Sequence, residues 1–523
     1  MSAIKTITAA GLLVSAILKS VAVAQTSPPI SARATLAKPL LIGEWADIGV
    51  LKDGADYYLV HSSGWYRPAV LIWHSKDLRT WTPTRYAVPE FDDGSIWVTD
   101  LAKVDGRYYI FFLRSFSWQS GGYMVTADSM DGPWSAPRPT GLPPDAVLAA
   151  DDSGKRYVFT GSGHLSELTD DNLRATKPPT KVYEGWLFPE DWAVEMYPCL
   201  EAPKILRRNG WWYLIEAEGG TFGPSTSHMV ISARSRSPSG SWENSPHNPI
   251  IRTCSREEPW WSKGHGQLVE GPNGNWFCVL HGIMNGYRSL GRCTLIEPIR
   301  WTDDGWFKVA ESWPGEWDNP VRIEMPISDE FDGEQFAIQW QFYRECDTNR
   351  FSLADGVLRL SGRGEDAGDS QPLTIQPMHR AYEIETEVEV SGDTTAGLML
   401  FATPDSYIGS GISEEGIVRR VQEGHKRYRW MKEPRIDRTR VQLRIVNDKQ
   451  DARFYYKDDH GRWQIVQPSM EVSQAVSTPS NLRPALFVCG GGEARFTYFR
   501  YRPLETDEQR DHWLEGMFRL SQD

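Results

Sequence analysis

Five side chains that can carry a proton or a negative charge precede five similar turns in this sequence. Each turn is an Asp-Gly or Asn-Gly pair, or a single Gly, followed by aromatic residues. The ionisable side chain lies 6 to 9 residues before the glycine, whereas a strand spans about 5–6 residues. Each side chain is therefore expected near the far end of the strand that enters its turn. The five residues are Asp47, Asp100, Asp145, Glu201 and His265.

Two of these carboxyl groups could hydrolyse a glycosidic bond. In that reaction an ionised carboxylate activates water and a protonated carboxyl group protonates the leaving oxygen. Asp47 lies in an otherwise apolar segment, where an Asp is costly unless it is hydrogen-bonded or functional; the structural alternative is an Asp that caps a turn. Apolar neighbours of Glu201 would raise its pKa, as a general acid needs; the alternative is an ion pair with Lys204 or an arginine.

The other three residues have structural as well as functional interpretations. Asp145 follows two prolines and is either a loop residue or a third carboxylate that tunes the other two. Asp100 follows Trp97-Val98-Thr99 and is interpreted as structural. His265 stands between two glycines, and close backbone approach, a metal or a substrate hydroxyl would each explain this setting.

The spacing of the turns predicts the elements that hold these residues. Successive glycines are 52, 48, 56 and 64 residues apart, close to the length of a four-stranded propeller blade, about 40–50 residues. A second recurring element, a Ser-rich turn leading to a Trp, predicts an outer hairpin whose Trp packs between blades. The inner strands of a propeller converge on one axis, so the five side chains would meet at one end of a central tunnel. A sixth turn, Asp304-Gly305, is interpreted as part of ring closure. The five glycines are Gly54, Gly106, Gly154, Gly210 and Gly274.

After the repeats, the pattern of apolar and polar residues changes. Glutamates alternate with a second set of residues from 382 to 390, which is the period of a half-buried strand. That set is Tyr382, Ile384, Thr386, Val388 and Val390, and further short strands separated by turns follow. We therefore predict an all-β chain, a five-bladed β-propeller followed by a β-sandwich of jelly-roll type. The predicted boundaries are a signal peptide at 1–24, the propeller at 25–325, the sandwich at 326–505 and a C-terminal tail, with a short amphipathic helix, at 506–523.

Length and composition limit the class of protein. The 523 residues are 40% hydrophobic and 24% charged, as in a soluble globular protein of two or three domains. A net charge of -13 argues against nucleic acid or an anionic membrane as a partner. The 23 Trp residues suit both a packed core and the faces of sugars. Six scattered cysteines leave room for one or two disulfides and show no zinc spacing.

The N-terminus has the three parts of a secretory signal. Lys5 precedes an apolar run from Ile7 to Leu18, and Ala22-Val23-Ala24 is a cleavage site. The run is too short to span a bilayer, and the sequence has no Asn-x-Ser/Thr glycosylation site. These features predict a secreted or periplasmic protein and favour a bacterial one. The sequence carries no signal for how many chains associate.

Several of these segments resemble glycoside hydrolase family 43. Trp45-Ala46-Asp47, with the turn and the His61-Ser62-Ser63 segment that follow, is similar to the family's opening blade with its catalytic base. Leu200-Glu201-Ala202-Pro203 is similar to the general-acid motif, and Asp145 stands where the family has a pKa-modulating Asp. Segments 289–292 and 264–266 resemble those that supply a substrate-binding Arg and a central His. The likeness covers roughly residues 40–310, and 328–505 resembles the concanavalin A-like domain of β-xylosidase-type members.

The resemblance implies an inverting, exo-acting hydrolase that releases β-D-xylose from plant-wall glycans or oligosaccharides. An α-L-arabinofuranosidase is the alternative, because the two sugars present similar hydroxyl geometry. Asp47 would be the base, Glu201 the acid and Asp145 the residue that holds Glu201 protonated and oriented. Sugar hydroxyls would contact Arg292 and His265. Trp97 and Trp65 are candidate stacking platforms.

The resemblance also implies a calcium or other cation in the tunnel near His265, as a structural group, because the chemistry itself needs no cofactor. The sequence departs from the family pattern at three places. Ile48 and Ala146 stand where a Pro is usual, and Ala202 stands where a Gly is usual. These changes spare the carboxylates but affect the backbone and the shape of the pocket.

Two other functions fit parts of the pattern. A propeller lectin would need aromatic residues and hydroxyl partners, but it has no use for two paired buried carboxylates. Another five-bladed glycosidase, such as a sucrose-type or an endo-acting arabinan hydrolase, would need an open groove and usually no covering second domain.

Overall fold

The computed structural model describes residues 36–91, 94–116, 119–169, 174–194, 199–318, 321–422, 433–476 and 480–504. The predicted signal peptide and the predicted helix of the C-terminal tail lie outside these residues. No helix in these ranges is long and apolar enough to cross a membrane. The named helices are short 3-10 turns: η1 (Gly161–Gly163), η2 (Arg288–Leu290), η3 (Gly315–Asp318), η4 (Thr348–Arg350) and η6 (Ser473–Ala475).

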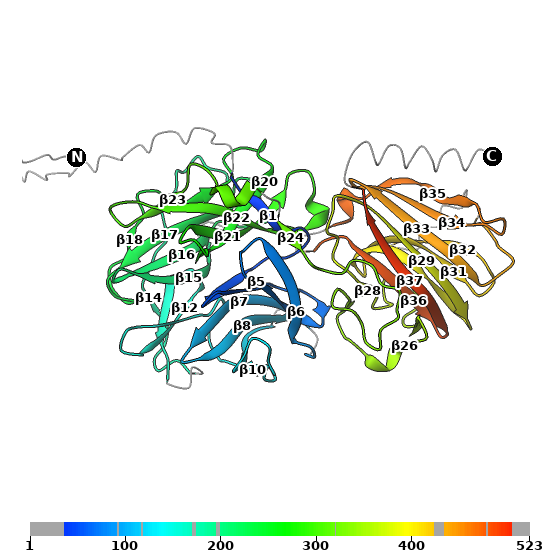
Figure 1. Ribbon diagram of the computed structural model, residues 1–523, viewed down its shortest axis with the longest axis horizontal. Coiled ribbons are helices and arrows are strands. Elements are labelled where there is room, and N and C mark those ends of the chain that lie inside the picture. Colours follow the sequence, from blue (N-terminus) through cyan, green and yellow to red (C-terminus); the bar gives the residue numbers. More distant parts are fainter. Residues whose placement is uncertain are drawn as a thin grey trace, which may run out of the picture. The chain divides into compact units, whose positions relative to one another are not determined.

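The first part of the chain folds into five antiparallel sheets, which are the blades of a propeller (Figure 1). Blade 1 contains β2 (Gly49–Asp53), β3 (Asp56–Val60), β5 (Ala69–Ser75) and β6 (Thr80–Val88). Blade 2 contains β7 (Ser95–Val104), β8 (Arg107–Phe116), β9 (Gln119–Ala127) and β10 (Arg138–Pro139). Blade 3 contains β11 (Val147–Ala150), β12 (Arg156–Thr160), β13 (His164–Glu167) and β14 (Thr180–Lys181). The predicted turns join the first two strands of each blade.

Blades 4 and 5 repeat this plan with additional outer strands. Blade 4 contains β15 (Leu200–Arg208), β16 (Trp211–Glu218), β17 (Met229–Ser235), β18 (Glu243–Asn244) and β19 (Ile251–Arg252). Blade 5 contains β20 (Trp260–Glu270), β21 (Trp276–Met284), β22 (Arg292–Trp301), β23 (Phe307–Val309) and the N-terminal strand β1 (Lys38–Leu41). The sixth turn, at Gly305, joins β22 to β23, so it belongs to the blade that closes the ring.

Two long-range contacts close the propeller ring. Strand β1 pairs with β22, so the beginning of the propeller completes its last blade. The linker after blade 5 then returns to blade 1, where β24 (Arg322–Ile323) pairs in parallel with β6. Trp81, from one of the predicted outer hairpins, is buried with Phe277 of blade 5 and Trp317 of the linker. The prediction that this Trp packs between blades is confirmed.

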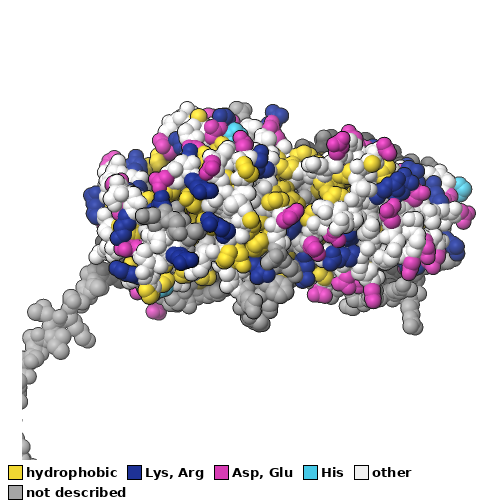
Figure 2. Space-filling view, turned by 90° about the horizontal axis from the view of Figure 1, so that it is seen from below, with side chains coloured by type: hydrophobic (Ala, Val, Ile, Leu, Met, Phe, Trp, Pro, Cys, Tyr) yellow, Lys and Arg dark blue, Asp and Glu magenta, His cyan; other side chains and the backbone are white. Residues whose placement is uncertain are grey.

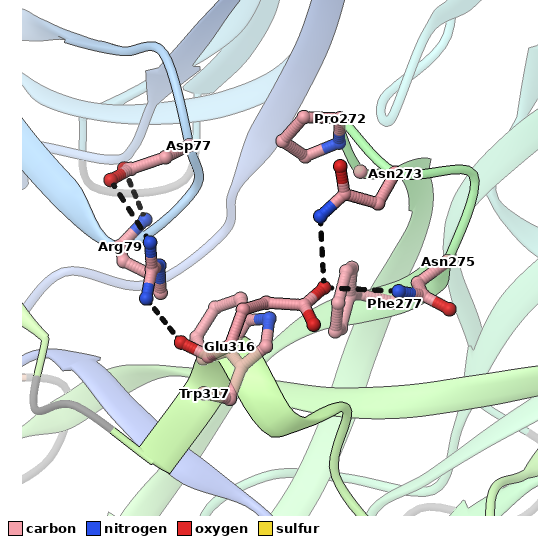
Figure 3. A pocket seen from close by; sticks show the side chains of 9 residues that line it. Asp77, Arg79, Pro272, Asn273, Asn275, Phe277, Glu316 and Trp317 are labelled. Carbon is pink, nitrogen blue, oxygen red and sulfur yellow. Dashed lines mark hydrogen bonds and ion pairs between the residues drawn. The ribbon is translucent and has the colours of Figure 1, made fainter.

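A small pocket lined by polar side chains and two aromatic rings marks the place where linker, blade 1 and blade 5 meet (Figure 3). The carboxylate of Glu316 accepts hydrogen bonds from Asn273 and Asn275, at 3.3 and 3.0 Å, in the blade 5 turn. Arg79 of blade 1 donates to the carbonyl oxygen of Glu316 and also forms an ion pair with Asp77. Because the polar groups that line this pocket pair with one another, we interpret it as a structural joint.

The second part of the chain is the predicted β-sandwich, formed by two seven-stranded sheets. One sheet contains β25 (Gln341–Tyr343), β28 (Leu373–Thr374), β30 (Thr394–Thr403), β31 (Ser406–Ser413), β32 (Val418–Gln422) and β36 (Arg483–Gly490). The other contains β26 (Phe351–Ala354), β27 (Val357–Ser361), β29 (Ala381–Ser391), β33 (Arg440–Asp448), β34 (Asp451–Lys457), β35 (Trp463–Glu471) and β37 (Glu493–Pro503). The predicted fold, a five-bladed propeller followed by a sandwich, is confirmed.

The strand with the clearest alternation shows why these residues form a sheet. Along β29, Ile384, Val388 and other apolar residues point into the sandwich core. The glutamates between them point outward, where Glu385 and Glu387 pair with arginines of the neighbouring strand β33. Such opposite-charge pairs across strands add to the stability of the sheet. On the molecular face in Figure 2, acidic and basic side chains are likewise interspersed.

The seventh strand of the first sandwich sheet comes from the propeller. Strand β4 (Tyr66–Arg67) lies between β3 and β5 of blade 1 in the sequence, yet it pairs with β25 at the edge of the sandwich. The two parts of the chain therefore share a sheet. None of the six cysteines, all of which the structure describes, is in a disulfide.

Candidate active site

In every blade the backbone is irregular near the predicted side chain, either within the ladder of the inner strand or just before that strand. The ladders of β7, β15 and β20 shift register beside Asp100, Glu201 and His265. Asp47 and Asp145 lie two residues before their strands and have φ angles of 57° and 59°. Bulges re-aim side chains, and a left-handed backbone at a non-glycine residue is typical of functional sites. The irregularities thus turn these side chains away from the ladders.

Asp47 is the buried centre of a charge network. Nη1 and Nη2 of Arg292 donate to its two carboxylate oxygens at 2.9 and 3.1 Å. On its other side, Arg292 donates from Nε and from its backbone N–H to the carboxylate of Glu44, at 2.8 and 2.6 Å. One guanidinium group therefore lies between two carboxylates and fixes the orientation of Asp47 through a bidentate contact.

The surroundings of Asp47 favour its ionised form. Burial alone would raise the pKa of this carboxyl group, but the positive charge of Arg292 and hydrogen bonds from Ser62 and Arg292 outweigh burial and leave the pKa lowered. Ser62 is itself held in place, because its hydroxyl accepts a hydrogen bond from the backbone of Val98 on the next blade. Asp47 is therefore a carboxylate, as a base must be.

Two neutral histidines contact Asp47. Nδ1 of His265 lies 3.4 Å from one carboxylate oxygen, and burial lowers the pKa of His265 to about 3. Because an ionised carboxylate can only accept, Nδ1 of His265 carries the proton and Nε2 has a lone pair. That Nε2 atom is buried without a hydrogen-bond partner among the described residues. His281 accepts a hydrogen bond from the backbone N–H of Asp47 at 3.3 Å.

A third histidine extends this row to Glu201. The ring of His228 stacks on His281 with centroids 5.3 Å apart. Its Nδ1 donates to the carbonyl oxygen of Gly219 at 2.6 Å, and burial lowers its pKa to about 4. The neutral ring therefore presents the lone pair of Nε2, which lies 3.8 Å from the Glu201 carboxyl group. The Glu201 side chain is 36% exposed, unlike the buried Asp47.

Asp145 and Asp100 have different neighbours from those of Asp47. Asp145 accepts a hydrogen bond from the backbone N–H of Ala202, the residue after Glu201, and burial raises its pKa. Asp100 accepts from the backbone N–H of Leu148 at 3.0 Å and lies 4.0 Å from the buried Lys204. Lys204 thus pairs with Asp100 and not with Glu201. The structural interpretation of Asp100 agrees with these contacts.

The two predicted tryptophan platforms lie in different surroundings. Trp97 is half-buried, with its ring centroid 5.6 Å from the Arg292 guanidinium carbon, and Phe222 approaches the same group at 5.3 Å. Trp65 contacts the sandwich, where the guanidinium carbon of Arg344 lies 5.2 Å from its ring. The structure therefore brings Trp97 to the charge network and Trp65 to the interface with the sandwich.

Sequence reasoning missed four residues of this site. Glu44 and Ser62 hold the charged groups, and His228 and His281 join the two carboxyl groups. His281 stands within the apolar strand β21, so the argument applied to Asp47, a polar residue in an apolar strand, could have identified it. His228 gave no comparable signal, because it follows a polar segment. Glu44 stands between the apolar residues 40–42 and Trp45-Ala46, so the same argument could have identified it too.

The donor atoms near His265 do not fit a directly bound calcium. One ligand atom each from Asp47, His265 and His281 lies within 4.8 Å of the others. Calcium takes about 6–8 oxygen ligands, whereas this set offers two imidazole nitrogens and a carboxylate already bonded to the cationic Arg292. The cation near His265 stays a prediction, and no step below depends on a metal.

Comparison with known proteins identifies the family. The profile of glycosyl hydrolases family 43 matches residues 36–307, and that of the β-xylosidase C-terminal concanavalin A-like domain matches residues 328–502. A non-reducing end α-L-arabinofuranosidase of Bacteroides ovatus is 30% identical over 73% of this chain and 77% of its own length. A xylan 1,3-β-xylosidase of a Vibrio species is 28% identical over 74% of this chain and 81% of its own length.

A solved structure shows the same arrangement of both domains. The family 43 protein of Bacillus licheniformis superposes with a TM-score of 0.78 at 26% identity, covering 89% of this chain and 99% of its own. Together with the profile matches, this likeness covers both the propeller and the sandwich. The chain belongs to glycosyl hydrolases family 43 and is a glycoside hydrolase that acts on a carbohydrate substrate.

Proposed function

We propose that the enzyme is an inverting, exo-acting hydrolase that releases β-D-xylose from plant-wall glycans or oligosaccharides. Relatives named β-xylosidase support this substrate class, and the relative named α-L-arabinofuranosidase supports the alternative sugar. The observation that carries the mechanism is the opposite environment of two carboxyl groups. Asp47 is bonded to a guanidinium group, whereas Glu201 faces the lone pair of a neutral imidazole. Such divided environments assign a base and an acid.

The proposed reaction uses one water molecule. Asp47 takes a proton from the water as its oxygen attacks the anomeric carbon, and Glu201 gives a proton to the departing glycosidic oxygen. His228 supports the protonated form of Glu201, because its lone pair can accept a hydrogen bond from a carboxylic acid but not from a carboxylate. Asp145 acts on Glu201 through the Ala202 backbone.

The sugar would be held by groups near the base. Nε2 of His265, which is buried and unpartnered among the described residues, can accept a hydrogen bond from a sugar hydroxyl. Arg292 and the half-buried Trp97 are proposed as further contacts, one polar and one through its ring face. Trp65 stays a prediction as a sugar platform, because its described contacts are with the sandwich.

The test compares two kinds of substrate. Wild-type enzyme should hydrolyse p-nitrophenyl β-D-xylopyranoside faster than the α-L-arabinofuranoside, and should release single xylose units from xylobiose. Asp47→Asn should lower kcat by about 10²–10⁴ on both aryl and sugar substrates, as expected on loss of a general base. Glu201→Gln should lose much more activity on xylobiose than on p-nitrophenyl β-D-xylopyranoside, because p-nitrophenolate can depart without a proton from an acid.

The matched control is Glu270→Gln, which changes an exposed carboxylate on the same strand as His265. It should keep wild-type rates. Proton NMR of the first product should show α-xylose, as inversion requires. Equal rates for wild type and Asp47→Asn would reject the assignment of the base, and β-xylose as first product would reject inversion. A preference for the arabinofuranoside would select the alternative sugar.

We also propose that residues 1–24 direct export to the periplasm or the medium. The apolar run from Ile7 to Leu18 and the Ala22-Val23-Ala24 site support this proposal. A mature N-terminus at Gln25, read by N-terminal sequencing of the exported protein, is the expected result. The net charge of -13 supports the further proposal that neither nucleic acid nor an anionic membrane is a partner.

A further inference from the structure

A glutamine of the sandwich is bonded to the backbone of the propeller beside the active site. Oε1 of Gln376 accepts a hydrogen bond from the backbone N–H of Glu44 at 3.2 Å, and its Nε2 donates to the backbone carbonyl of the same residue at 3.0 Å. The Gln376 side chain is 6% exposed. One amide group thus satisfies both backbone groups of Glu44, as a neighbouring strand would.

The residue held in this way supports the arginine of the site. The Glu44 carboxylate accepts hydrogen bonds from the backbone and the Nε atom of Arg292, and Arg292 then binds both oxygens of Asp47. We call these four residues, Gln376, Glu44, Arg292 and Asp47, the Gln376 relay. It runs from the sandwich to the carboxylate proposed as the base through direct hydrogen bonds only.

Gln376 is itself fixed within the sandwich. The side-chain amide of Asn481 donates to Oε1 of Gln376 at 2.7 Å, and Arg483 donates to Oδ1 of Asn481 at 3.1 Å. The Arg483 guanidinium carbon lies 3.4 Å from the ring centroid of Tyr66, on the propeller strand β4. Asn481 and Arg483 are almost completely buried. The amide of Gln376 therefore has one defined orientation.

The sandwich also holds the turn that precedes Arg292. Gln450 accepts a hydrogen bond from the Ser289 hydroxyl at 2.8 Å and donates to the carbonyl of Gly286 at 3.0 Å. The backbone N–H of Leu482 donates to the carbonyl of Ser289. Gly291 has a φ of 83°, and a Cβ atom there would lie 2.4 Å from the Glu44 carboxylate. The chain thus passes closely between Glu44 and the sandwich.

We propose that the sandwich is a positioning element of the active site, acting through the Gln376 relay to hold Arg292 against Asp47. Gln376 is a positioning residue, because it touches neither the proposed substrate nor the reacting atoms. The proposal rests on the proposed role of Asp47 as base. The sheet shared by the propeller and the sandwich helps to keep the two ends of the relay at a fixed separation, as hydrogen bonds require.

The test replaces Gln376 by Met, which is similar in length but cannot form the two hydrogen bonds. The control is Tyr86→Phe. It removes another hydrogen bond between propeller and sandwich, from the Tyr86 hydroxyl to the carbonyl of Ile338 at 2.9 Å, but lies outside the relay. Both variants and the wild type are studied as full-length proteins, well below their unfolding midpoints. Two measurements are made, amide hydrogen exchange by mass spectrometry and steady-state kinetics on p-nitrophenyl β-D-xylopyranoside.

We expect faster exchange in Gln376→Met in the peptides that contain Glu44 and Arg292, and wild-type exchange in the same peptides of Tyr86→Phe. We expect kcat per folded molecule to fall by about 10- to 100-fold in Gln376→Met, because small displacements at a reacting centre can have effects of this size. The control should keep a kcat within about twofold of wild type, since its loss is that of one ordinary hydrogen bond remote from the site.

The outcomes separate the two proposals. Unchanged exchange at Glu44 and Arg292 in Gln376→Met would overturn the relay whatever the activity. Equal losses of kcat in Gln376→Met and Tyr86→Phe would also overturn it, because a general weakening of the interface would then suffice. If the wild type hydrolysed neither pentoside, the proposed substrate would fail, while the exchange measurement would still decide the relay.

Discussion

Replacing Arg292 by Met would test the charge arrangement of the site. Arg292 stands between Glu44 and Asp47 and donates to both carboxylates. Met would fill part of the same space but would leave two carboxylates without their cation. Their side chains are 15% and 9% exposed, so water cannot replace the lost charge well. We therefore expect a large loss of stability.

The magnitude follows from the burial of this pair. Exposed ion pairs are worth about 0–1 kcal/mol, but removing one partner of a buried pair costs about 3–5 kcal/mol because a charge is left uncompensated. Unfolding entropy is about 2.1 cal/mol/K per residue, or roughly 0.6 kcal/mol/K for a propeller of about 270 residues. The melting temperature of Arg292→Met should therefore fall by roughly 5–9 °C at neutral pH.

The effect should depend on pH in one direction. The pKa of Asp47 is lowered in the folded protein, so its interaction with Arg292 contributes stability above the unfolded-state pKa of about 3.9. That contribution is lost as pH falls through the still lower folded pKa. In Arg292→Met, protonation of Asp47 removes the unpaired charge, so the variant loses less stability at acidic pH than at neutral pH. The gap in melting temperature between wild type and variant should narrow from pH 7 to about pH 4.

The assay is thermal unfolding followed by circular dichroism at both pH values. Asp47→Asn should lower the melting temperature less than Arg292→Met does, because Arg292 keeps Glu44 as its partner. The double variant, Arg292→Met with Asp47→Asn, should melt above Arg292→Met alone at pH 7, because one stranded charge has been neutralised. The reasoning would be refuted if Arg292→Met melted within about 1 °C of wild type, as a surface pair would, or if the double variant melted lowest.

Three further predictions concern other buried groups. Lys204→Met should lower the melting temperature by several degrees, because it leaves the buried Asp100 without the ammonium group 4.0 Å away; an unchanged melting curve would contradict this. Gly264→Ala should abolish most activity on p-nitrophenyl β-D-xylopyranoside, since its Cβ would lie 1.8 Å from a histidine ring carbon. The control Gly315→Ala should keep nearly all activity, because its Cβ would meet no atom within 4 Å. Glu218→Gln should stabilise the protein increasingly as pH rises from about 5 to 9. Burial raises the pKa of Glu218 to about 8, so the folded state binds an extra proton between the two pKa values and loses stability as pH rises; equal melting curves at pH 9 would refute this.

The positions of the blades could be predicted because each repeat carries its own turn signal. A tight hairpin turn needs residues with positive φ, which an Asn-Gly or Asp-Gly pair supplies. Gly54, Gly106 and Gly210 have φ values of 62°, 79° and 72°. Such local conformations depend on a few neighbouring residues. The alternation along β29 similarly depends only on which side chains face the core. These turns and strands could therefore be predicted from local sequence alone.

The contacts of the site were not readable in this way, because they join residues far apart in the sequence. Arg292 and Asp47 are 245 positions apart, and Gln376 and Glu44 are 332 apart. The bulges beside Glu201 and His265 were not predicted either, although two glycines flank His265. Ala202, for example, has a φ of 53° although it is not a glycine. Its backbone N–H bonds to Asp145, so a tertiary contact overrides the local preference.

Tertiary contacts also separate the roles of two carboxylates that their sequence neighbours do not separate. Asp100 and Asp47 both stand in apolar surroundings, and sequence alone gives them similar environments. In the structure, Asp100 accepts a backbone hydrogen bond and faces an ammonium group from another blade, whereas Asp47 has a guanidinium group on one side and a row of neutral imidazoles on the other. The chemical difference between a structural and a reactive carboxylate therefore arises from the partners that the ring of blades brings to each. Because each blade contributes its own partner residue, a change in one blade can alter the chemistry of one carboxylate without altering the others.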